Sequence, residues 1–195
     1  MNINVELFNF FNHSLQNPIL DSIMPIVTHF GGFIFLVLVV FALVLYAKIS
    51  RRDTLKKVAI ITLIALLFSG AITVALKHIV HEPRPFMTLD NVHLLIAEDD
   101  LNSFPSGHAT ATIAVVASLI LNMKDLAKKH YLIIDIALVI FAAVILFSRM
   151  YVGVHYPGDI LAGTIVGLFG ALLFNHFKEL IYSISRRLKS LISKK

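Results

Sequence analysis

Long apolar stretches alternate with short basic clusters along most of this chain. The apolar stretches cover residues 23–47, 55–80, 109–123, 131–152 and 160–177. A helix that crosses a bilayer takes roughly 20 residues, and each stretch reaches or approaches that length. The pattern therefore predicts an all-α fold, a polytopic membrane helix bundle of about five transmembrane helices.

The composition agrees with a bilayer as the solvent. Apolar residues make up 57% of the chain and charged residues 15%, and the mean hydropathy is +0.83, unlike a soluble globular domain. No linker or internal repeat divides the chain, so we predict one domain over residues 1–195 with a transmembrane core at 20–178. Cysteine is absent, which excludes a disulfide framework and a thiolate metal site.

Both ends of the chain are expected to lie on the membrane surface. Within residues 1–17, apolar side chains recur from Val5 to Leu15 at helical spacing between polar ones, which favours an interfacial helix over a sixth span. No basic segment precedes an apolar core here, as it would in a cleaved signal peptide. Residues 179–195 mix apolar and basic side chains and predict a basic amphipathic tail on anionic lipid.

Three basic clusters determine the expected orientation. They consist of Lys48, Arg51, Arg52, Lys56 and Lys57, then Lys124, Lys128 and Lys129, and finally Lys178, Arg186, Arg187, Lys189, Lys194 and Lys195. Five spans place all three clusters on one face of the cell membrane, and the positive-inside rule makes that face cytoplasmic. The pI of about 9.5 thus reflects membrane topology, and no nucleic-acid partner is indicated.

The remaining cations stand apart, each at one end of an apolar stretch. They are Lys77, Arg84 and Arg149, and the predicted topology brings them to the extracytoplasmic face together with His108, His155 and Asp159. Cations of this kind neutralise phosphate oxygens, and a histidine held by a carboxylate can attack phosphorus. The sequence therefore indicates a phosphate site at the outer ends of several spans.

A serine and a glycine open the third apolar stretch. Ser106 is a good N-cap residue, and Pro105 stops any helix before it. The amides of Ser106 and Gly107 then lie at a helix N-terminus, where unpaired N–H groups favour an anion. We expect both residues to contact the phosphate.

Three segments carry a family resemblance: KHIVHEPRP at 77–85, PSGH at 105–108 and SRMYVGVHYPGD at 148–159. They resemble the three signature motifs of the type 2 phosphatidic acid phosphatase superfamily, which also includes vanadium haloperoxidases and some bacterial acid phosphatases. All signature positions match, and the resemblance in motif and architecture covers roughly residues 55–175. Each motif lies at a helix end on the same predicted face.

The resemblance implies a role for each residue. His155 would be the nucleophile that forms a phosphohistidine, and Asp159 would hold the proton on its other ring nitrogen. His108 would protonate the leaving oxygen and later activate water. The substrate phosphate would be bound by Lys77, Arg84, Arg149, Ser106 and Gly107. This scheme requires neither a metal ion nor another cofactor.

The same residues taken singly also have structural explanations. Lys77 and Arg149 can snorkel to the interface, the histidines can be packing residues, and Ser106 and Asp159 can cap helices. All of them together at one depth favour a site, because ionisable groups within a membrane are functional by default. The acidic run 98–100 is interpreted as a solvated loop rather than a cation site. The small-residue face from Gly163 to Gly167 predicts packing within the chain rather than a dimer contact.

The substrate class follows from the membrane setting and from a second resemblance. The segment from Leu7 to Met24 is similar to small bacterial undecaprenyl-diphosphatases of this superfamily, which implies a polyprenyl diphosphate. Phosphatidic acid and phosphatidylglycerol phosphate are the alternatives. A haloperoxidase would be soluble, and a lipid carrier or channel component would not need both histidines with the carboxylate. A lipid-to-lipid phosphotransferase would use the same phosphohistidine and stays open.

Overall fold

The computed structural model describes residues 2–184, and within them the regular structure is helical throughout. The elements are α1 (Ile3–Asn9), the π-helix η1 (Phe10–Ser14), α2 (Pro18–His29), α3 (Phe33–Ile49), α4 (Asp53–Val80), α5 (Pro85–Thr88), α6 (Gly107–Ile120), α7 (Met123–Ala127), α8 (Tyr131–Tyr151) and α9 (Pro157–His176). An isolated bridge pairs Pro83 with Asn102. The prediction of an all-α membrane bundle is confirmed.

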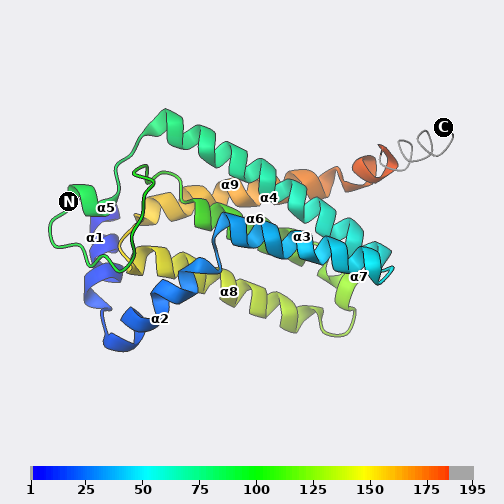
Figure 1. The fold of residues 1–195 in the computed structure, drawn as a ribbon, viewed down its shortest axis with the longest axis horizontal. Coiled ribbons are helices and arrows are strands. Elements are labelled where there is room, and N and C mark those ends of the chain that lie inside the picture. The colour runs from blue at the N-terminus through cyan, green and yellow to red at the C-terminus, as the bar shows by residue number, and fades with distance from the viewer. Residues whose placement is uncertain (1, 185–195) are drawn as a thin grey trace.

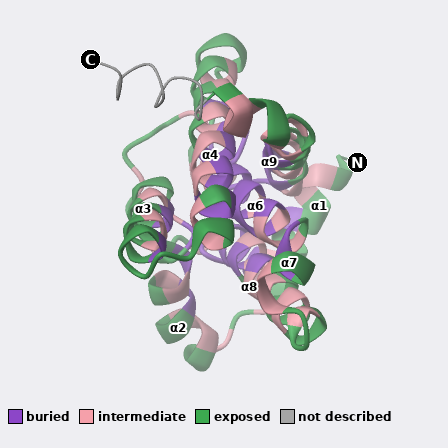
Figure 2. Ribbon diagram, turned by 90° about the vertical axis from the view of Figure 1, so that its right-hand side faces the viewer, coloured by how far each residue is buried: buried purple, intermediate pink, exposed green. Residues whose placement is uncertain are grey.

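Helix α6 lies at the centre of the bundle. It packs against α9, α4, α8 and α3, which run along the long axis of the molecule (Figures 1 and 2). Its buried side chains are small: Ala109, Thr110, Ala111, Thr112, Ala114, Val115, Val116 and Ser118. Small side chains allow close approach of helices in a membrane. Four neighbours can therefore surround this one helix.

The glycines of α9 provide the closest of these contacts. A Cβ atom at Gly163 would lie 2.6 Å from the carbonyl oxygen of Ser106, and one at Gly167 would lie 2.5 Å from that of Thr110. Only glycine leaves room for α6 at these two positions. The predicted packing of this face within the chain is confirmed.

The expected first span is not one continuous helix. The run 23–47 is divided between α2 and α3, which are bent by 55° at residues 30–32. Gly31 sits in this break so close to α8 that a Cβ atom would lie 2.3 Å from Cγ2 of Ile145. Gly32 then adopts an extended conformation and begins α3. The break thus falls where α8 approaches closely, within a stretch that hydropathy alone presents as unbroken.

All five expected apolar stretches form helices, although not all of these helices are long enough to cross a membrane as one unbroken element. Helices α4, α8 and α9 are long and apolar enough to cross a membrane, and the bent pair α2–α3 adds a fourth span if it counts as one. Helix α6 has 14 residues, or about 21 Å, which is shorter than the hydrocarbon core. The other helices surround α6, so it does not have to meet the lipid along a full span.

The N-terminal segment is helical, as predicted, and is packed onto the protein. Helices α1 and η1 lie across one end of the bundle (Figure 1). The side chains of Phe8 and Asn12 are fully buried, and the ring of Phe8 lies 5.6 Å from that of Tyr156. The N-terminal segment therefore packs against the start of α9 at this end of the bundle.

The charged groups separate between the two ends of the bundle. The α3–α4 and α6–α8 connections carry the first two basic clusters, and Lys178 follows α9 at the same end (Figure 1). The rest of the third cluster and most of the predicted tail lie outside the described residues. The candidate site residues gather at the opposite end.

Candidate active site

Helix ends position most of the candidate side chains. Helix α4 ends where His81 adopts a left-handed conformation with φ of 52°, which leaves Lys77 in its last turn. Arg84 precedes Pro85, the first residue of α5. Arg149 belongs to the last turn of α8. His108 and Asp159 lie in the first turns of α6 and α9, and His155 lies in the short connection between α8 and α9.

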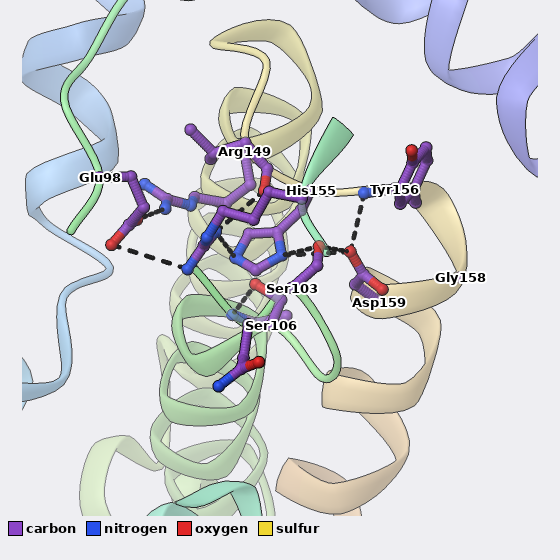
Figure 3. A network of polar contacts seen from close by, with 12 residues as sticks. Glu98, Ser103, Ser106, Arg149, His155, Tyr156, Gly158 and Asp159 are labelled. Carbon is purple, nitrogen blue, oxygen red and sulfur yellow. Dashed lines mark hydrogen bonds and ion pairs between the residues drawn. The ribbon is translucent and has the colours of Figure 1, made fainter. Parts of the chain in front are cut away.

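His155 lies at the centre of the site and is almost fully buried (Figure 3). Its Nδ1 atom is 3.2 Å from Oδ2 of Asp159, and its Nε2 atom is 3.1 Å from Nη1 of Arg84. A guanidinium can only donate, so Nε2 must accept, and the ring proton belongs on Nδ1 beside the carboxylate. The lone pair of Nε2 therefore points toward the cations.

The environment of His155 keeps its ring neutral. Burial is the main cause, and the positive charges of Arg149, Arg84, Lys77 and His108 add to it, so the pKa of His155 lies well below its ordinary value. A neutral imidazole is the form that can attack phosphorus. His108 lies beside the break between α2 and α3, where a Cβ atom at Gly32 would lie 3.8 Å from its Nε2 atom.

Asp159 is held by three groups besides its own helix. Its Oδ2 atom accepts from the backbone N–H of Tyr156 at 2.8 Å and from the hydroxyl of Ser103, and it faces His155 (Figure 3). The capping interpretation from the sequence is thus correct, and it coexists with the contact to the imidazole. One carboxylate begins α9 and orients the ring.

The sequence analysis missed Ser103. This residue is fully buried, and its Oγ atom also lies 3.3 Å from Nδ1 of His155. It comes from the irregular segment before α6, where no periodicity marks it. Its position two residues before Pro105 was the only available signal. Ser103 links the loop to the histidine–carboxylate pair.

The acidic run 98–100 enters the site, contrary to its interpretation as a solvated loop. Glu98 bridges two guanidinium groups, with Oε2 at 2.8 Å from Arg149 and Oε1 at 3.6 Å from Arg84. Asp100 bridges Lys77 at 2.9 Å and Arg84 at 3.7 Å. Burial opposes ionisation of Asp100, but the hydrogen bond and charge of Lys77 outweigh it and lower its pKa. Each of the three cations therefore has a carboxylate partner from one loop.

Arg149 is the most deeply enclosed of the cations. Its Nη1 atom donates to the hydroxyl of Thr28 on α2 at 2.8 Å, and its Nε atom has no hydrogen-bond partner among residues 2–184. An unsatisfied buried donor is costly unless a ligand completes it. The Nε group is thus a buried donor that an anion beside Arg149 could satisfy.

Ser106 and Gly107 begin α6 as expected, with one correction. The Ser106 hydroxyl accepts from the backbone N–H of Ala109 at 3.4 Å and caps the helix. Its own backbone N–H donates to the carbonyl of Asp159 at 3.1 Å, so that amide is occupied rather than free for an anion. Gly107 lines the apolar cavity beside the site.

This cavity lies between α3 and α4 and has a volume of about 360 Å³. Its wall is mainly apolar, and Lys77 and Asp100 line it as well. A Cβ atom at Gly70 would lie 2.4 Å from the ring of Phe33, so this glycine allows α3 to approach α4 here. An apolar chain in the cavity would place a polar head group beside Lys77.

A neutral histidine that a carboxylate orients, in contact with Arg84 and near two further cations at the end of an apolar helix bundle, has the parts that a membrane phosphatase needs. The model of the PAP2 superfamily matches residues 58–182. The chain therefore belongs to the PAP2 superfamily, in agreement with the resemblance of its three motifs.

Individual relatives agree with this membership. The chain is 33% identical over 181 residues to undecaprenyl-diphosphatase BcrC of Bacillus subtilis, covering 92% of this chain and 86% of that protein. It is 27% identical over 170 residues to phosphatidylglycerophosphatase B of the same organism, covering 86% and 79%. The crystal structure of Aquifex aeolicus LpxE superposes with a TM-score of 0.73 at 26% identity, covering 90% of this chain and 96% of that one.

Proposed function

We propose that this protein hydrolyses a polyprenyl diphosphate, such as undecaprenyl diphosphate, through a phosphohistidine intermediate. The observation that carries the proposal is the orientation of His155, whose Nδ1 faces Asp159 while Nε2 faces Arg84. One nitrogen is held by a base, and the other is directed to the place where cations would hold a phosphate.

The first step transfers the terminal phosphoryl group to the histidine. The Nε2 lone pair of His155 attacks phosphorus, a P–N bond forms, and the bond from phosphorus to the bridging oxygen breaks. The leaving lipid phosphate takes a proton from His108. Asp159 stabilises the positive charge on the imidazole, and Lys77, Arg84 and Arg149 stabilise the charge on the phosphoryl oxygens.

The second step returns the histidine to its starting form. His108, now neutral, takes a proton from water, whose oxygen attacks phosphorus. The P–N bond breaks, inorganic phosphate leaves, and the electron pair returns to Nε2 of His155. Dividing one displacement in two lowers each barrier.

Two observations favour a polyprenyl diphosphate over the other lipids. The relative that is 33% identical over 92% of this chain is named an undecaprenyl-diphosphatase. The apolar cavity ends beside Lys77 and Asp100, and the described groups that follow toward His155 are Arg84 and Arg149. The two linked phosphates of a diphosphate would fit the succession of Lys77, Arg84 and Arg149. Phosphatidylglycerol phosphate is the second candidate, since a 27% identical relative is named for it.

A parallel assay tests the proposal and its chemistry. Purified protein should release phosphate from undecaprenyl diphosphate faster than from phosphatidic acid or phosphatidylglycerol phosphate, each measured in the same detergent. Activity should survive EDTA, because the cations of the site supply the positive charge that phosphoryl transfer needs. Orthovanadate should inhibit, because it adopts the transition-state geometry.

Three results would contradict this prediction. Faster phosphate release from phosphatidylglycerol phosphate would make that lipid the proposed substrate. Transfer of phosphate to an added lipid alcohol, without release of inorganic phosphate, would indicate a phosphotransferase. Loss of activity on chelation, restored by Mg²⁺ alone, would remove the metal-independent scheme.

Single cysteines test the proposed orientation. The chain has no cysteine, and both Asn91 and Ser50 are exposed, at opposite ends of the bundle. If the basic clusters are cytoplasmic, Asn91→Cys should react with a membrane-impermeant thiol reagent in intact cells and Ser50→Cys should not. Labelling after membrane disruption is the control, since both variants should then react. The reverse pattern would place the site in the cytoplasm.

A further inference from the structure

The cations of the site are more deeply buried than their carboxylate partners. The side chains of Arg149 and Arg84 are 1% and 2% exposed, and that of Lys77 is 12% exposed. Those of Glu98 and Asp100 are 21% and 44% exposed. A rotation of the two acidic side chains would release the cations without disturbing their positions.

The backbone that precedes Glu98 and Asp100 is anchored to the rest of the protein. We therefore expect these carboxylates to leave the cations by rotation of their side chains. Leu95 and Ile96 pack with the buried cluster at the end of α8. The side chain of Asn12 accepts from the backbone N–H of His93 and donates to its carbonyl, both at 2.9 Å. Glu98 and Asp100 follow this anchored segment directly.

The two buried guanidinium groups are paired with carboxylates, and Arg84 also donates to the backbone carbonyls of Val154 and Asp100. A buried charge that loses its partner is strongly destabilising. In the free protein the carboxylates of Glu98 and Asp100 supply the compensating negative charge, and each bridges two cations as phosphate oxygens would. A substrate must therefore displace them.

We propose that Glu98 and Asp100 are specificity-determining residues, because in the free protein their carboxylates occupy the places of the two phosphates of a diphosphate. This inference rests on the proposed function of the three cations as phosphate ligands. Glu98, between Arg149 and Arg84, marks the place of the terminal phosphate beside His155. Asp100 forms an ion pair with Lys77 beside the apolar cavity, and it marks the place of the phosphate attached to the lipid.

The two places predict a selection by charge. A diphosphate displaces both carboxylates and satisfies all three cations. A monophosphate that reaches His155 displaces only Glu98, and Asp100 remains on Lys77 and Arg84. Glu98 and Asp100 already share Arg84, but a phosphate carries a charge of about −1.5 to −2 where Glu98 carries a single negative charge, so its repulsion with the remaining Asp100 is greater. Asp100 therefore disfavours monophosphates, while Glu98 competes with both kinds of substrate equally.

Three isosteric variants of the full chain separate these roles, assayed with farnesyl diphosphate and farnesyl phosphate. Asp100→Asn should lower the ratio of kcat/KM for the diphosphate to that for the monophosphate about tenfold, a change that corresponds to about 1.4 kcal/mol. Glu98→Gln should raise kcat/KM for both and leave the ratio unchanged. Asp99→Asn is the matched control, because Asp99 is exposed and makes no ion pair within residues 2–184.

Binding of inorganic phosphate and pyrophosphate provides a measurement independent of turnover. In a His155→Ala background, calorimetry should show that Asp100→Asn narrows the gap between the two affinities about tenfold and that Asp99→Asn does not. A wild-type protein that hydrolyses no lipid phosphate would overturn the proposed function, and these affinities would still decide the role of Asp100. The result that would overturn the inference is an equal effect of Asp100→Asn and Asp99→Asn, both on the ratio of kcat/KM values and on the difference between the phosphate and pyrophosphate affinities. Asp100 would then only support the fold.

Discussion

His155→Ala should lower phosphate release by roughly 10⁴-fold or more, the scale seen when the nucleophile of a catalytic unit is removed. The substitution deletes Nε2, which faces Arg84, and leaves no atom to form the P–N bond. Because the ring is neutral and buried, its loss removes no buried charge from the fold. The initial rate of phosphate release measures the loss of catalysis. The elution of the purified protein in size-exclusion chromatography measures separately whether the fold is retained.

His130→Ala is the matched control for this change. His130 is exposed and lies before α8, at the end of the bundle opposite the site. It should retain the activity of the unmodified protein. Full-rate phosphate release from a folded His155→Ala variant would remove this histidine from the mechanism and, with it, the phosphohistidine.

Arg84→Met should lower kcat/KM on the order of 10³-fold, near the upper end of the cost of removing one preorganised donor from a site of developing charge. Arg84 is the cation in direct contact with His155, and it also interacts with both Glu98 and Asp100. Methionine has a similar length and removes every donor. Arg84→Lys restores the charge without the planar fork, so it should recover only part of the loss.

The fold should tolerate the loss of Arg84. Glu98 keeps its contact with Arg149, and Asp100 keeps its contact with Lys77, so neither acidic side chain is left without a cation. Lys129→Met serves as a control for net charge, because Lys129 is exposed and lies at the opposite end of the bundle. Activity of Arg84→Met within a few-fold of that of Lys129→Met would show that Arg84 does not bind the transferring phosphoryl group.

The predicted roles of Ser106 and Asp159 show how function and capping combine. The sequence presented them as either phosphate-site residues or helix caps. In the structure both residues cap, and Asp159 also contacts His155. A carboxylate in the first turn of a helix accepts backbone N–H groups on one side and can orient a neighbouring ring on the other. The two interpretations were never exclusive.

Hydropathy located the apolar stretches but not the breaks within them. The run 23–47 is apolar throughout, and the bend falls at residues 30–32, where Ile145 of α8 occupies the space that a side chain at Gly31 would need. Helix α6 has only 14 residues, and four other helices pack around it. Both features involve neighbours that are distant in the sequence, which a sliding window does not include.

The sequence by itself determined the helical membrane class, the grouping of the site residues at one end and the family, because these follow from local properties. Span length, basic clusters and three short motifs are each read within a few tens of residues. The tertiary structure decided which groups accompany the cations and the histidine. Glu98 reaches Arg149 across 51 residues, Ser103 reaches Asp159 across 56, and Asn12 holds His93 across 81. A polar residue in an irregular loop has no periodicity to reveal its partner, and only the packing of the helices brings such pairs together.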